Sequence, residues 1–151
     1  MPQGIRASYG PVLVAYAGLA GASTLALRRR GRRVAVPGPT DVVLLGLATF
    51  KLSRLVAKDK VLAPVREPFV EKVEPGAGSE LNSTPGGRGV RRAVGELLTC
   101  PFCVSVWIAT GLTVAFAVVP RAARLAASGL AAVVVADTSQ YAYSGLRKAA
   151  E

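Results

Sequence analysis

The sequence predicts an all-α integral membrane protein with three to four transmembrane helices and a flexible cytoplasmic loop. Hydrophobic residues make up 51% of the 151-residue chain and charged residues 19%, a balance that soluble domains of this length rarely show. The hydrophobic residues form uncharged blocks separated by basic clusters, as in integral membrane proteins. Because those clusters flank hydrophobic blocks, the net charge of +10 favours contacts with anionic membrane lipids over nucleic acid binding.

The first region, residues 1–36, is expected to be an N-terminal transmembrane anchor with an arginine-rich flank. Residues 11–27 are uncharged, and as a helix they would span roughly 25 Å, enough for the hydrocarbon core of a bilayer. The basic cluster 28–33 follows at once, whereas a signal peptide carries its positive charge before the hydrophobic run. We therefore expect an anchor that runs from outside to inside.

The second region, residues 37–74, combines an apolar and basic helix with a proline-punctuated element at the membrane interface. The helix is expected to be capped by Thr40 or Asp41 and to carry Lys51 and Arg54 towards its end. It either spans the membrane while both cations snorkel, or dips into the cytoplasmic interface. Partial insertion is favoured, because it keeps residues 28–99 on one side and satisfies the positive-inside rule.

The last two regions are a loop and a helical hairpin. Residues 75–92 are rich in Gly, Pro and Ser and predict a flexible loop, and we place residues 57–96 in the cytoplasm. Residues 93–148 contain a Cys-x-x-Cys turn and a transmembrane hairpin that is broken at Pro120. Small residues repeat every four positions in the second helix of this hairpin and are expected to pack against the first helix: Ser128, Ala132 and Ala136.

Cys100 and Cys103 lie where the basic region meets a hydrophobic helix. Thr99 or Cys100 is expected near the N-cap and Pro101 at the first helical position, where a missing N–H costs nothing. Both thiols would then share one face of the first turn, where the positive end of the helix dipole should lower a thiol pKa. Trp107 follows about one turn into the helix, as an interface anchor would.

Three interpretations of the cysteine pair are open. The thiols could pack the helix start, kept reduced by the cytoplasm; they could form a membrane dithiol redox pair; or two chains could share a zinc ion, since one chain supplies two of four ligands. The chain has no histidine, which removes Ser/His and Cys/His nucleophile pairs and His-containing metal sites. We therefore expect no enzymatic activity, no catalytic residue and, outside the zinc alternative, no cofactor.

Charged residues also occur in or beside the hydrophobic segments. An unpaired charge at the membrane centre costs about 2.5–3.5 kcal/mol on insertion scales. A single acid makes no proton relay, so we expect Asp137 to pair with Lys51 or Arg54 and join two helices. The interfacial element contributes three further candidates, of which the first two form a candidate pair: Asp59, Arg66 and Glu67.

Several linked motifs between residues 41 and 140 resemble a known family. They are Ala48–Leu55, Asp59–Val61, Pro64–Phe69 and Glu96–Cys103, followed by Trp107. In this order they are similar to domain-of-unknown-function family 1360, the YjcA-like, sporulation-associated small bacterial membrane proteins, which also has members in bacteriophages. The resemblance implies a multi-pass protein of the bacterial cell membrane and brings no catalytic residues.

The leading functional hypothesis is a non-enzymatic membrane protein that acts through protein partners or self-association. Its contact surface would be the basic loop and the Cys-x-x-Cys turn, and the resemblance implies a role in sporulation or envelope development. One alternative is a holin-like pore former, suggested by the small size, the small-residue faces and the bacteriophage members of the family. The other is a dithiol redox or dimeric metal-binding protein that uses Cys100 and Cys103.

Overall fold

The computed structural model describes residues 3–29, 34–76 and 80–150, and most of them are helical. The elements, in chain order, are α1 (Gln3–Arg29), α2 (Pro39–Lys58), α3 (Ala63–Arg66), the 3-10 helix η1 (Glu67–Phe69), β1 (Val70–Pro75), β2 (Leu81–Pro85), α4 (Gly89–Thr99), α5 (Pro101–Val118) and α6 (Pro120–Ala150).

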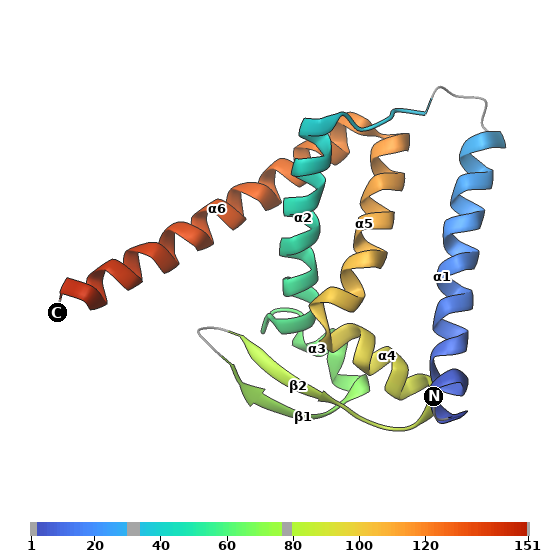
Figure 1. The fold of residues 1–151 in the computed structure, drawn as a ribbon, viewed down its shortest axis with the longest axis horizontal. Helices are drawn as coiled ribbons and strands as arrows, with labels where there is room; N and C mark the ends of the chain where they lie inside the picture. Colours follow the sequence, from blue (N-terminus) through green and yellow to red (C-terminus); the bar gives the residue numbers. More distant parts are fainter. Residues whose placement is uncertain (1–2, 30–33, 77–79, 151) are drawn as a thin grey trace.

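Helix α2 is the central element, and it packs against both α5 and α6 (Figure 1). α1, α2 and α5 extend in similar directions, whereas α6 starts beside the end of α5 and diverges across α2. The elements from α3 to α4 gather at the end of the helices opposite to the start of α6, where α2 ends and α5 begins. We call residues 59–99 the cap.

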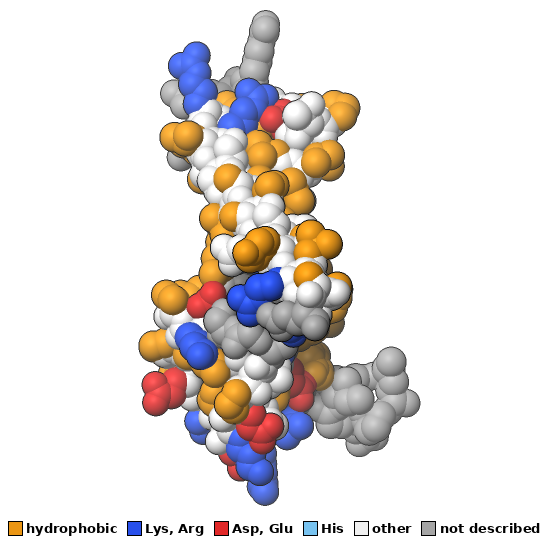
Figure 2. All heavy atoms as spheres, turned by 90° about the vertical axis from the view of Figure 1, so that its left-hand side faces the viewer, with side chains coloured by type: hydrophobic (Ala, Val, Ile, Leu, Met, Phe, Trp, Pro, Cys, Tyr) orange, Lys and Arg blue, Asp and Glu red, His pale blue; other side chains and the backbone are white. Residues whose placement is uncertain are grey.

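Three of the described helices are long and hydrophobic enough to cross a membrane: Tyr9–Arg29 within α1, α5 and α6. Large hydrophobic side chains such as Leu13, Val14 and Leu19 are exposed along α1. Figure 2 shows charged side chains gathered towards the two ends of one face, with mostly hydrophobic and uncharged atoms between them. This distribution is compatible with a membrane location.

α2 is one continuous helix and is not among the three helices that could cross a membrane, so its expected partial insertion stays a prediction. α2 has 20 residues and lies lengthwise against α5, so the segments on either side of it, around Arg29 and Lys58, lie at opposite ends of the helices. Its N-cap is Gly38, and Asp41 sits at the third helical position, where its carboxylate accepts the Gly38 N–H at 3.1 Å. The N-cap of α2 therefore lies earlier in the chain than expected.

The hydrophobic core lies where α2, α5 and α6 meet. It is built from Leu45 and Ala48 of α2, Phe116 of α5, and Ala123 and Ala127 of α6. The buried small residues of α6 therefore follow the predicted four-residue spacing but on another face. The residues predicted to pack are exposed instead: Ser128, Ala132 and Ala136.

An antiparallel hairpin corrects the all-α prediction. β1 pairs with β2 with Val73 opposite Ser83, and the Gly86 N–H donates to the Phe69 carbonyl at 2.9 Å. The hairpin and the first turn of α4 occupy most of the stretch predicted as a flexible loop, while residues 77–79 lie outside the described part. β2 carries few hydrophobic residues, so its sequence lacks the alternating pattern that would predict a strand.

Candidate functional site

The Cys-x-x-Cys turn joins α4 of the cap to α5. Cys100 is the N-cap of α5 and Pro101 occupies the first helical position, which confirms the predicted start of this helix. The Cys100 Sγ accepts a hydrogen bond from the Cys103 N–H at 3.2 Å. Cys103 is exposed, and the ring of Phe102 between the two cysteines is 87% exposed.

The two cysteines form a disulfide, with their Cα atoms 5.3 Å apart. They are therefore bonded here, unlike the reduced thiols expected for a cytoplasmic turn. Among the described residues, no group of three or more His, Cys, Asp or Glu side chains could hold a metal ion within one chain. A zinc ion shared between two chains stays a prediction.

Trp107 connects α5 to α1. Its ring meets the ring of Tyr16 edge-on, with the centroids 5.2 Å apart, and the Tyr16 hydroxyl lies 2.8 Å from the Thr110 hydroxyl. Edge-to-face aromatic pairs add about 0.5–1.5 kcal/mol beyond their buried area. The predicted interface anchor thus also contributes to helix packing.

The charged residues of the hydrophobic segments connect α2 to two different elements. The Lys51 Nζ lies 2.6 Å from the Asp137 Oδ2 and links α2 to α6. Arg54 pairs with Glu80 of the cap instead, and its guanidinium lies 5.8 Å from the centre of the Phe50 ring. The structure therefore brings together Asp137 and one of the two cations proposed for it.

A second ion pair links α2 to α6 at the other end of α2. Arg124 donates from Nε and Nη2 to the two oxygens of Asp41, at 2.7 and 2.9 Å, and its guanidinium lies 5.1 Å from the centre of the Phe116 ring. This pair was not predicted from the sequence. Both residues lie near helix starts, so only the pairing of α2 with α6 could have indicated it.

Arg66 is buried in the cap, where it donates to two backbone carbonyls, Val56 O at 2.6 Å and Asp59 O at 2.9 Å. The predicted partner of Arg66 was the Asp59 side chain, but that carboxylate accepts the Val61 N–H at 2.8 Å. Burial lowers the pKa of Arg66 from its ordinary value, and the charge of Asp59 opposes this. Glu67 is exposed at the start of η1.

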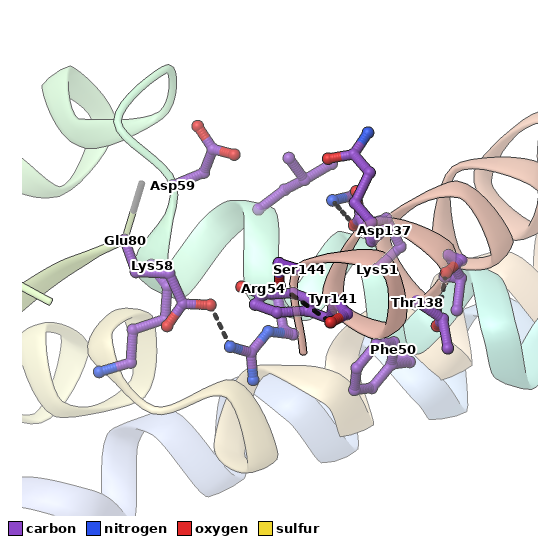
Figure 3. Close-up of a pocket in the computed structure, with 13 residues that line it drawn as sticks. Phe50, Lys51, Arg54, Lys58, Asp59, Glu80, Asp137, Thr138, Tyr141 and Ser144 are labelled. Carbon is purple, nitrogen blue, oxygen red and sulfur yellow. Dashed lines mark hydrogen bonds and ion pairs between the residues drawn. The ribbon is translucent and has the colours of Figure 1, made fainter. Parts of the chain in front are cut away.

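A cleft of about 520 Å³ opens between α2 and α6 next to the cap (Figure 3). We call it the α2–α6 cleft. Its charged lining comes from α2, the cap and α6 and includes Lys51, Arg54, Lys58, Glu80 and Asp137. Thr138, Tyr141 and Ser144 of α6 complete it, and the hydroxyls of Thr138 and Ser144 donate to the Val134 and Tyr141 carbonyls of the same helix. The cleft can therefore offer charged and neutral hydrogen-bond donors to one bound group.

Comparison with known proteins gives a consistent match. The family described as "Protein of unknown function (DUF1360)" matches residues 44–143. "Sporulation protein YjcA" of Bacillus subtilis (strain 168) is 40% identical over 108 residues, which cover 66% of this chain and 92% of that protein. "UPF0713 protein YngL" of the same organism is 29% identical over 84 residues, which cover 54% of this chain and 61% of that protein.

No solved structure matches the chain. The family match begins in α2 and ends in α6, so it contains the disulfide and the Lys51–Asp137 pair, while α1 lies outside it.

Proposed function

The chain belongs to the DUF1360 family of proteins of unknown function, and we propose that it is a multi-pass bacterial membrane protein that acts through a protein partner or a second copy rather than as an enzyme. The family gives no biochemical activity. The word sporulation belongs to the name of YjcA, and we propose that this chain shares a role in sporulation or envelope development.

The observation that carries the proposal is the set of hydrophobic side chains exposed on the cap. Lipid would cover the exposed hydrophobic residues of α1 and α6, but the cap lies beyond the end of α2 and α5. Even so, Val61, Val65 and Val73 are more than half exposed there, as is Phe102 at the adjoining turn. Exposed hydrophobic residues among charged ones are typical of protein interaction surfaces.

The basic residues of the cap support a cytoplasmic side for it. Lys58, Lys60, Lys72, Arg88 and Arg91 all lie within residues 57–96. An excess of Lys and Arg is typical of cytoplasmic loops. We therefore propose that the contact surface, including the Cys100–Cys103 turn, faces the cytoplasm, which requires the disulfide to be reduced there.

The test is site-specific photo-crosslinking in living cells. A photoreactive amino acid replaces Val65 on the cap, and Leu19 on the exposed side of α1 is the matched control. We expect protein adducts from position 65 and mainly lipid adducts from position 19. Co-expression of two differently tagged copies separates a second copy from another partner.

Absence of any protein adduct at position 65, in a chain that stays in the membrane fraction, would overturn the proposal. Leakage of the cells on expression, with a protein-free cap, would favour the pore-forming alternative instead.

A second candidate function is thiol–disulfide chemistry at the α5 start. The observation that favours it is the bonded pair Cys100–Cys103, with Cys103 exposed at the turn. A variant with both Cys100→Ser and Cys103→Ser separates the two functions. If crosslinking at position 65 is retained in this variant, the partner contact does not need the cysteines; its loss with folding intact would support the redox function.

A further inference from the structure

We propose that the α2–α6 cleft binds the phosphate of a membrane phospholipid headgroup. The inference rests on the membrane location in the proposed function, and it assigns a ligand to a cleft that the partner contact does not use. It comes from the arrangement of charges around the cleft, from the donors that remain available there, and from the position of the cleft along the helices.

The cationic side of the cleft is a single stripe on α2. Lys51, Arg54 and Lys58 are three and four residues apart, so they project from one face of the helix, and all three line the cleft (Figure 3). A row of cations at a helix surface is a usual receptor for phosphate oxygens.

The carboxylates of the cleft hold these cations in place without using up their donors. Lys51 contacts Asp137 through one ammonium, which has three N–H groups, and Arg54 contacts Glu80 through Nη2 of a guanidinium with five. Lys58 donates to Asn82 at 3.0 Å. Donors that are already positioned lose little conformational freedom when a ligand arrives, which favours binding.

The charge balance of the cleft selects the kind of phosphate. Three carboxylates line it beside the three cations, namely those of Asp59, Glu80 and Asp137. A phosphodiester carries one negative charge, whereas a free phosphate or a phosphomonoester carries between about one and a half and two at pH 7. A nearly neutral cleft repels a singly charged phosphodiester less than a more highly charged phosphate, and the hydroxyl of Tyr141 can donate to the phosphodiester without adding charge.

The position of the cleft explains why the phosphodiester would belong to a lipid. The cleft lies at the cap end of α2, between the uncharged middle of the helices and the charged cap, which is the level of lipid headgroups in a membrane. Phe50 and Val134 form hydrophobic edges of the cleft. These side chains offer a path for the acyl chains.

The experiment is native mass spectrometry of the full chain purified in detergent. The probes are phosphatidylglycerol, phosphatidylethanolamine, a diacylglycerol with the same acyl chains, and inorganic phosphate. The test variant is Arg54→Gln with Lys58→Gln, and the control variant, Lys72→Gln with Arg88→Gln, removes the same charge from exposed positions on the cap.

We expect the wild-type chain to retain a phospholipid and the test variant to bind it about tenfold or more weakly, because charged hydrogen bonds to phosphate are lost. The control variant should stay within about twofold of the wild type. Circular dichroism and size-exclusion chromatography check that each variant is folded. If the double variant does not fold, Lys58→Gln with its matched control Lys72→Gln replaces it, since the Lys58–Asn82 bond is exposed.

Three results would overturn the proposal. Equal weakening in the test and control variants would show attraction to surface charge only. Equal retention of diacylglycerol would show that acyl chains bind without a phosphate. Saturation by inorganic phosphate that displaces the lipid would show a site for free phosphate. Extraction of cell membranes with carbonate tests membrane residence separately, so failure of the proposed function is distinguishable from failure of this site.

Discussion

Arg66 shows how one buried side chain fastens the cap to α2. Its guanidinium reaches the last turn of α2 and the residue that follows it, where helix carbonyls have no partner within the helix. Because Arg66 is 1% exposed, water cannot easily replace these two hydrogen bonds. The cap and the end of α2 should therefore lose stability together when this side chain is removed.

The replacement Arg66→Met should lower the free energy of unfolding by about 2–4 kcal/mol, since each buried carbonyl left without a donor costs about 1–3 kcal/mol. The measurement is denaturant unfolding in detergent micelles, followed by circular dichroism. Arg91→Met is the matched control, because the Arg91 Nε also donates to a backbone carbonyl, Pro68 O at 2.9 Å, but from an exposed position. An equal loss in both variants would contradict the importance of burial.

Gly95 marks the closest approach of α4 to the rest of the cap. A Cβ added there would lie 2.5 Å from the Phe69 carbonyl oxygen, a contact that requires the backbone to move. Gly95→Ala should therefore destabilise the chain by about 1–3 kcal/mol in the same unfolding assay. Gly111→Ala in α5 is the control, because its added Cβ meets nothing within 4 Å and alanine favours the helix by about 1 kcal/mol. A neutral Gly95→Ala would show that α4 and η1 are not tightly packed.

Some of these residue contacts could be predicted from the sequence and others could not, for a physical reason. Desolvation requires a buried or membrane-level charge to find a partner, so Asp137 could be expected to meet Lys51 or Arg54. The choice of Lys51, and the separate pairing of Arg54 with Glu80, depends on how the hairpin folds back onto α2. That is a long-range property, which local spacing does not encode.

At the scale of elements, hydrophobic blocks were sufficient to locate the long helices. The uncharged runs lie within α1, α2, α5 and α6. The packed face of α6 was predicted wrongly, because alanine and other small residues occur on more than one side of this helix. Composition therefore identified the element, whereas the partner helix selected its buried face.

The ion pair between Lys51 of α2 and Asp137 of α6 joins two helices, and a double-mutant cycle can measure its coupling energy. Lys51→Ala and Asp137→Ala should each destabilise the chain, and the two changes together should cost less than their sum, with a coupling energy of about 0.5–3 kcal/mol. The Arg92–Glu96 pair within α4 is the control, and its coupling should be about 0.3–0.5 kcal/mol because it is an exposed helical pair. Additive effects at positions 51 and 137 would contradict a structural ion pair.

For the whole molecule, the lengthwise packing of α2 defines an alternative to the predicted partial insertion, namely a full crossing of the membrane. A half-inserted α2 would leave the segment before it and the cap on the same side of a membrane. The structure instead places α2 beside α5 over its length, with Asp41–Arg124 near one end and Lys51–Asp137 towards the other. The ion pairs lower the cost of burying α2 charges, and of these pairs the sequence predicted only that of Asp137 with Lys51 or Arg54.

The topology that follows can be tested with single cysteines in a chain carrying Cys100→Ser and Cys103→Ser. Val36→Cys lies before α2 and Lys72→Cys lies in β1, and both positions are exposed. If α2 crosses the membrane, a membrane-impermeant maleimide should label one of them in intact cells and the other after permeabilisation. Leu19→Cys, at an exposed position within α1, should react poorly in both cases because lipid covers it. Labelling of positions 36 and 72 from the same side would support the half-inserted helix, and labelling of position 72 in intact cells would move the cap out of the cytoplasm.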